Sequence, residues 1–221
     1  AEAQMRSGFG VYIRDLLSIG REAYYLEPAD PRYTGELLRG PIDPGGFLCY
    51  TPWAANYKVI SNCQTILSSA DADAGAKGFA QTVNAYCLMR VLNLTDTNGA
   101  RLNYDGDITA AVATKAEVLA EIESLLDAGL SNLQSAESSF SFTLSSGFDS
   151  FNTPATFAHF NRGLRARIAV LQDDWSAAQT ALTSCADWMN SSDDDMGVYH
   201  VFSSGANDGD NQMYEASDAA T

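Results

Sequence analysis

The fold is decided by residues 153–178, which read TPATFAHFNRGLRARIAVLQDDWSAA. Thr153 followed by Pro154 predicts a helix start, because threonine caps the first turn and proline fits the first helical position. Asp173 and Asp174 predict a turn. Apolar residues recur at helical spacing before this turn at Phe157, Phe160, Leu164, Ile168 and Leu171, and after it at Trp175, Ala178, Leu182, Cys185 and Trp188. The stretch therefore predicts two helices joined as a hairpin.

Small residues predict that the two helices of this hairpin approach closely. Ala166, Ala169 and Ala178 leave room for backbone contact. An aliphatic stripe, a short acidic turn, an aromatic residue and an alanine are typical of a tetratricopeptide-type helix pair, although no strict period of about 34 residues is present. We interpret Trp175 and Trp188 as packing residues.

A second hairpin is predicted upstream. Pro52 fits the first turn of a helix, and the apolar residues that follow at helical spacing are Trp53, Tyr57, Ile60, Cys63, Ile66 and Leu67. Residues 71–75 make the turn, and residues 76–94 form the returning helix. A further long helix is predicted over 115–133, because Thr114 and Glu117 make a capping box.

The remaining segments are predicted to be loops, apart from a short apolar helical face at residues 12–17. Residues 27–46 contain prolines and glycines that exclude a helix interior, yet the arginines and tyrosines between residues 21 and 39 favour an ordered loop. Residues 135–152 predict a loop or a short β-hairpin, and no helical period continues beyond residue 190. The predicted fold is mostly α, with tetratricopeptide-like helix hairpins and long ordered loops in one domain over residues 1–221.

The charge excludes two classes of partner. The chain has 13 Lys and Arg against 28 Asp and Glu, a formal net charge of −15. A nucleic-acid binder needs clustered basic residues, and so does a surface held on anionic lipid by charge. The negative charge is uneven, since residues 153–189 are neutral while residues 190–221 carry acids and no base.

The four cysteines give little support for a zinc site, because they form no CxxC pair and lie far in sequence from both histidines. Cys63, Cys87 and Cys185 fall on apolar helical stripes, and we expect them to be small buried side chains. The sequence leaves a disulfide pairing open.

Several segments, in order, resemble the SusD/RagB family of outer-membrane nutrient-binding lipoproteins. The first is Trp53-x3-Tyr57-x2-Ile60-x2-Cys63-Gln64-x-Ile66-Leu67, and the others are residues 76–90, 118–133, 150–178 and 197–202. The chain departs from the family pattern at Cys63, Gln64 and Asn84, where alanine, asparagine and arginine are usual.

This resemblance implies a function and a location. The protein is expected to capture an oligosaccharide or similar nutrient at the cell surface and to pass it to a SusC-type TonB-dependent outer-membrane transporter. It is expected to be lipid-anchored through an N-terminus absent from this chain, since no cysteine stands at Ala1. Family members are longer, so the chain is expected to be an N-terminal or internal portion without the C-terminal half. The alternative is a helical-repeat scaffold for protein interaction or assembly, without glycan binding.

Glycan binding requires aromatic faces for sugar C–H groups and polar side chains for the hydroxyls. Tyr50, Trp53 and Asn56 are the best candidates in one short segment. The spacing of Trp53 and Tyr57 is equally typical of core residues, and this alternative stays open. The loop tyrosines that are also available are Tyr24, Tyr25, Tyr33 and Tyr104.

Catalysis and cofactors have weaker support. His159 and His200 stand in no recognisable nucleophile motif, and no glycine-rich phosphate loop is present, so we predict a binding protein and no enzyme. A calcium ion is possible where oxygen-bearing side chains alternate around glycines, although the terminal glutamate of an EF-hand is missing. The candidate ligands are Asp96, Asn98, Asp105 and Asp107, with a shorter version at residues 207–211.

Overall fold

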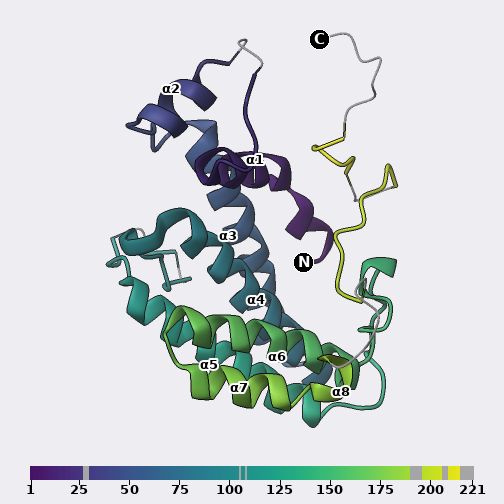
Figure 1. Ribbon diagram of the computed structural model, residues 1–221. Helices are drawn as coiled ribbons and strands as arrows, with labels where there is room; N and C mark the ends of the chain where they lie inside the picture. The colour runs from purple at the N-terminus through teal and green to yellow at the C-terminus, as the bar shows by residue number, and fades with distance from the viewer. Residues whose placement is uncertain (27–29, 105, 108, 190–195, 206–208, 215–221) are drawn as a thin grey trace. The chain divides into compact units, whose positions relative to one another are not determined.

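The computed structural model describes residues 1–26, 30–104, 106–107, 109–189, 196–205 and 209–214. These residues form helices and contain no β-strand beyond an isolated bridge between Ala100 and Ala113 (Figure 1). The mostly helical fold predicted from the sequence is therefore confirmed. The chain divides into two compact units, one of Val59–Val201 with Ala1 and one of Glu2–Lys58 with Phe202–Thr221. A single domain over residues 1–221 stays a prediction.

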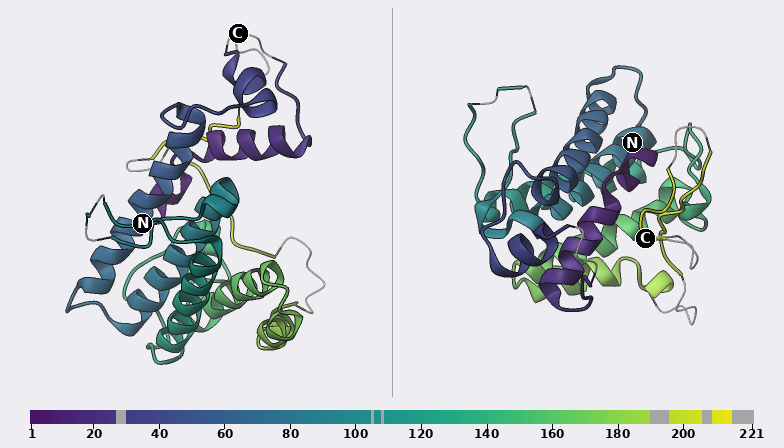
Figure 2. Two further views of the ribbon diagram at one scale, coloured as in Figure 1. Left: turned by 90° about the vertical axis from the view of Figure 1, so that its left-hand side faces the viewer. Right: turned by 90° about the horizontal axis from the view of Figure 1, so that it is seen from above.

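The larger unit is a series of packed helices. The chain enters it through the second half of α3 (Phe47–Ser68) and continues through α4 (Ala74–Thr95), α5 (Lys115–Gln134), α6 (Pro154–Leu171), α7 (Trp175–Thr183) and α8 (Ala186–Met189). Helix α4 packs on α5, α5 on α6, and α6 on α7. Helices α5, α6 and α7 lie side by side in Figures 1 and 2. Short 3₁₀ turns stand at Asp96–Asn98 and Ser146–Phe148.

Side-chain caps explain where these helices begin. Thr114 and Glu117 make the predicted reciprocal box at the start of α5, and Thr153 makes one with Thr156 at the start of α6, where Pro154 occupies the first turn. The carboxylates of Asp73 and Asp174 accept from the backbone at the starts of α4 and α7. Each cap satisfies backbone N–H groups that have no partner inside the helix.

Close helix packing in the larger unit depends on small residues. Ala166, Ala169 and Ala178 are all buried, as predicted. Helices α4 and α5 also approach closely, since a Cβ added to Gly78 would lie 2.7 Å from Cγ of Leu133. Large side chains that are fully buried in the helices of this unit include Leu88, Ile122, Leu126, Phe157 and Ile168.

A buried polar network crosses the helices of the larger unit. The Asn161 amide on α6 donates to the Thr82 hydroxyl at 2.8 Å and to the Leu126 carbonyl at 3.0 Å. Its oxygen accepts from Arg162, which also pairs with Asp127 at 2.9 Å. Arg165 pairs with Glu123 on α5. Nothing in the hydrophobic pattern of the sequence indicates this network.

Aromatic packing fixes the loop between α5 and α6. Phe140, Phe142 and Phe148 from this loop surround Phe79 of α4, with ring centroids 5.3–6.4 Å apart. Phe157 of α6 completes the cluster. The short β-hairpin considered for residues 135–152 is absent from this described segment, because its phenylalanines pack against helices.

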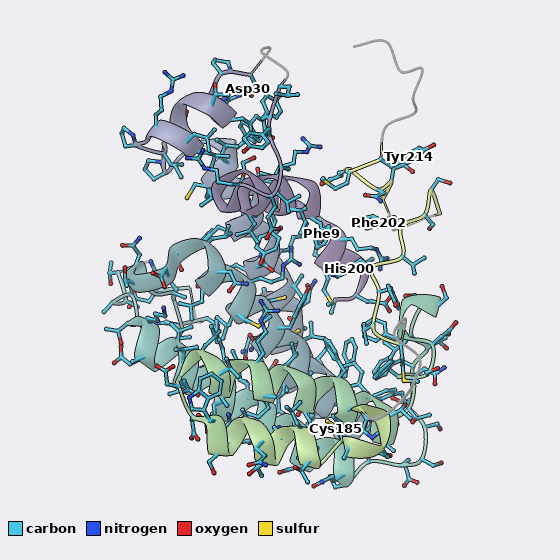
Figure 3. All side chains as sticks on the ribbon, viewed as in Figure 1. Phe9, Asp30, Cys185, His200, Phe202 and Tyr214 are labelled. Atoms are coloured by element: carbon cyan, nitrogen blue, oxygen red, sulfur yellow. The ribbon has the colours of Figure 1, made fainter. Side chains whose placement is uncertain are left out.

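The smaller unit consists of a 3₁₀ turn at Ala3–Arg6, α1 (Phe9–Gly20), α2 (Arg32–Arg39), the first half of α3 and the segment from Phe202. Phe9 and Phe202 lie with ring centroids 6.1 Å apart (Figure 3). The Gly10 N–H donates to the Gln212 side chain at 3.0 Å, which caps the first turn of α1 from a distant part of the chain.

Three details of the predicted helices were wrong. Helix α2 lies inside the segment predicted to be loop, because the prolines of that segment stand outside Arg32–Arg39. The helix tolerates Gly35 in its interior and continues through Glu36, Leu37 and Leu38, which are good helix formers. Pro52 stands inside α3, which begins five residues earlier at Phe47. Helix α7 ends at Thr183, and Ala186–Met189 forms a separate short helix.

Trp175 is also not a packing residue, since 65% of its surface is exposed at the start of α7. The buried face of α7 is formed by Ala178 and Ala181. The side chain of Trp188 lies outside the part of the chain that the structure describes.

Candidate functional site

The strongest candidate site is an aromatic stripe on the first half of α3, formed by Tyr50, Trp53 and Tyr57. These residues are three and four positions apart, so they lie on one face of the helix. Tyr50 is 59% exposed, and Trp53 and Tyr57 are half-buried. The Trp53 and Tyr57 rings lie 4.4 Å apart between centroids with planes inclined by 40°. The three aromatic residues of the stripe therefore lie on one helical face that is partly exposed.

Asn56, the third predicted site residue, does not join this stripe. Only 2% of its surface is exposed, and its side-chain amide donates to the Pro52 carbonyl at 2.7 Å. This contact holds Asn56 against its own helix and satisfies a polar group that burial would otherwise make costly. The structure therefore places Tyr50 and Trp53 together on a surface and Asn56 inside.

The loop tyrosines differ in exposure. Tyr24 is 73% exposed, whereas Tyr33 is 4% exposed and belongs to the core of the smaller unit. Tyr25 stacks on Tyr33 with centroids 4.2 Å apart, and Phe47 packs edge-on against Tyr33 with centroids 5.7 Å apart. Tyr33 is therefore a packing residue, which the prediction of a loop at this position obscured.

A carboxylate that the sequence argument did not single out stands at the start of α3. Asp43 accepts from the Gly45 N–H at 2.9 Å, and its own N–H donates to Glu36 at 3.1 Å. A Cβ on Gly46 would lie 3.5 Å from Oδ2 of Asp43. Because Gly46 is four residues before Tyr50, this carboxylate lies at the N-terminal end of the aromatic stripe. The Asp-Pro-Gly sequence was a turn signal, but it did not indicate proximity to Tyr50.

Arg32, a cation near this end of α3, is already paired. The Arg32 guanidinium lies 4.3 Å from the centre of the Phe47 ring. It also donates twice to Asp30, at 2.9 and 2.7 Å. This bidentate pair offsets the charge of Arg32, so the start of α3 has an acidic character set by Asp43 and Glu36.

Asp15 on α1 adds a buried carboxyl to the same unit. It is 2% exposed, and its Oδ1 has no hydrogen-bond partner among the described residues. Burial raises the pKa of Asp15 to about 7, against an opposing effect of Arg14. Burial also raises the pKa of the Cys49 thiol, and the charges of Asp15 and Asp43 add to this effect.

Two of the candidate calcium ligands, Asp96 and Asp107, interact with other groups of the protein. Asp96 pairs with Lys115 at 2.5 Å, and Asp107 accepts from the backbone and hydroxyl of Thr109 at 2.8 and 2.6 Å. Asn98 is exposed, and Asp105 lies outside the described residues, as do 207 and 208 of the second cluster. Within the described part of the chain, no three His, Cys, Asp or Glu residues are grouped to hold a metal ion. Calcium binding stays a prediction.

Both histidines contact neighbouring segments of the larger unit. His159 on α6 lies 3.8 Å from the exposed carboxylate of Asp187. His200 Nε2 lies 3.2 Å from the Tyr86 hydroxyl on α4. Both contacts tie a later segment of the chain to an earlier helix.

Comparison with known proteins adds no relative: no protein-family model matches the chain, and no curated protein matches it. Within the described residues, no helix has the length and apolar character needed to cross a bilayer.

Proposed function

We propose that this protein binds an oligosaccharide on the aromatic stripe of α3 and holds it without chemical turnover. The observation that carries the proposal is the exposed Tyr50 in line with the half-buried pair of Trp53 and Tyr57. Large amphipathic rings of this kind present an apolar face to the C–H groups of a sugar and a polar edge to its hydroxyls. The helix fixes their spacing before the ligand arrives, which lowers the entropic cost of binding.

The resemblance to the SusD/RagB family supports the same proposal and extends it. In that setting the protein is a lipid-anchored capture protein at the outer cell surface. It passes the bound nutrient to a SusC-type TonB-dependent transporter. Its helix pairs then form a tetratricopeptide-like framework.

Isothermal titration calorimetry against a panel of oligosaccharides tests this function. The panel contains maltohexaose, cellohexaose, β-1,4-mannohexaose and hexagalacturonate, each titrated into the wild-type chain. We expect at least one ligand to bind, and we expect Tyr50→Ala and Trp53→Ala each to weaken it by about tenfold or more, as exposed aromatic anchors do in other interfaces.

Trp175→Ala is the matched control. It removes an aromatic residue of comparable exposure from the larger unit and should leave the affinity unchanged. Circular dichroism of each variant verifies its helix content. Absence of binding to the whole panel, or equal loss of affinity in Trp175→Ala, contradicts glycan capture at the stripe.

The second candidate function is a scaffold for protein assembly, and a specific surface favours it. Helix α7 exposes Trp175 at 65% and Leu182 at 38%, and the end of α6, the helix packed on it, exposes Val170 and Leu171. Exposed tryptophan with aliphatic neighbours is typical of protein interfaces. Sedimentation velocity over a concentration series tests this function: self-association that Trp175→Ala abolishes, together with no binding to the glycan panel, would favour the scaffold.

A further inference from the structure

We infer that the α3 stripe selects neutral oligosaccharides over acidic ones, and that Asp43 sets this selection by accepting a sugar hydroxyl at the N-terminal end of the stripe. This inference rests on the proposed function and names the ligand class and a further binding residue. The observations behind it are the charge of α3, the position of the Asp43 carboxylate and the groups around it.

Helix α3 offers almost no charge to a ligand. Its 22 residues contain one charged side chain, Lys58. Lys58 follows Tyr57 and lies about 100° further around the helix, off the face of the stripe. A ligand on this face therefore meets aromatic rings and small neighbours such as Ala54, and α3 itself places no cation on this face to compensate a carboxylate or sulfate.

Asp43 gives this face a hydrogen-bond acceptor. Its Oδ1 accepts from the Gly45 N–H at 2.9 Å, and no described residue donates to its Oδ2. Oδ2 lies against Gly46, one helical turn before Tyr50. An ionised carboxylate only accepts hydrogen bonds, so it suits the hydroxyl of a sugar stacked on Tyr50.

The same carboxylate disfavours an acidic sugar. Glu36 is a second carboxylate next to Asp43, since it accepts from the Asp43 N–H at 3.1 Å. The charge of Arg32 is already paired with Asp30. Like charges brought together at a binding surface lower affinity, and their effect falls as salt screens them. The net charge of −15 acts in the same direction at longer range.

Paired ligands with the same sugar backbone, one with a C6 hydroxyl and the other with a C6 carboxylate, test the inference. The affinity for maltohexaose, cellohexaose and β-1,4-mannohexaose is each compared with the affinity for the same oligosaccharide oxidised to the carboxylate at C6. We expect the neutral form to bind at least about fivefold more tightly at low salt, as a repulsion near 1 kcal/mol between surface charges predicts. This ratio should shrink at high salt.

Asp43→Asn then identifies the residue responsible. Asparagine retains an oxygen for the Gly45 N–H and removes the charge, so we expect the ratio to fall toward one while circular dichroism stays unchanged. Acidic forms that bind as tightly as neutral ones, with both lost in Tyr50→Ala, would overturn the selection and leave glycan capture standing. A preference that Asp43→Asn leaves intact overturns the role of Asp43, and no binding by any ligand overturns both proposals.

Discussion

At the scale of the residue, Asp15 makes stability depend on pH. Its side chain is buried and its Oδ1 has no partner among the described residues. Burial raises its pKa from 3.8 to about 7 in the folded chain, so the folded state keeps a proton that the unfolded state loses. Between about pH 4 and pH 7 the folded state therefore binds more protons, and stability falls as pH rises through this range.

Asp15→Asn should remove this pH dependence. We expect the variant to be more stable than the wild type at pH 8 by about 1–3 kcal/mol, the range for relieving a buried polar group without a partner, and to match it near pH 4. Urea denaturation at several pH values measures the difference. Asp71→Asn in the exposed turn before α4 is the control and should follow the wild-type profile. Parallel profiles for wild type and Asp15→Asn would show that Asp15 is not responsible.

At the scale of the element, the contact between α4 and α5 depends on a missing side chain. A Cβ on Gly78 would lie 2.7 Å from Cγ of Leu133 and 2.9 Å from the Gly129 carbonyl. Gly78→Ala improves helix propensity but forces the two helices apart, and we expect a net loss of about 1–3 kcal/mol. Thermal denaturation followed by circular dichroism measures this loss.

Gly163→Ala on α6 is the opposite case. A Cβ added there meets no atom within 4 Å, so only the gain in helix propensity remains. We expect the free energy of unfolding to rise by about 0.5–1 kcal/mol. The two variants share one chemical change and differ in their surroundings. A gain in both would contradict the close packing of α4 on α5.

The elements were predictable where local chemistry determines them. The capping boxes at Thr114 and Thr153 depend on residues close in sequence, and so does the apolar periodicity of the helices that follow them. The structure confirms both helix starts. The prediction of a loop at α2 was wrong because it applied the helix-breaking effect of the flanking prolines and glycines to residues 32–39. That stretch itself contains neither a proline nor a turn. Pro52 shows the same limit, since α3 tolerates the loss of one N–H inside its second turn.

At the scale of the whole molecule, the candidate site was predictable only in part. The spacing of Tyr50 and Trp53 placed them on one helical face, but exposure depends on what packs against that face, and the sequence allowed a core as well as a surface. Asn56 is buried, and the Pro52 carbonyl of its own helix satisfies its amide. Asp43 reaches the stripe through the conformation of the turn before α3, which no periodic pattern describes.

The thiols report on the two units separately. All four are free, with Cys49 exposed on the smaller unit and Cys63, Cys87 and Cys185 buried in the larger one. Burial raises the pKa of Cys63 to about 12 and also raises those of Cys87 and Cys185. Because the thiolate is the reactive form, these three should stay unreactive until the larger unit opens.

Labelling with a chromogenic disulfide reagent should therefore give one reactive thiol in the native protein and four in denaturant. The rate at Cys49 should increase with pH, and it should increase further in Asp15→Asn, because removing that carboxylate lowers the pKa of the neighbouring thiol. Cys49→Ser is the control and should abolish native labelling. Two or more native equivalents would mean that the larger unit opens on the timescale of labelling, and fewer than four in denaturant would reveal a disulfide.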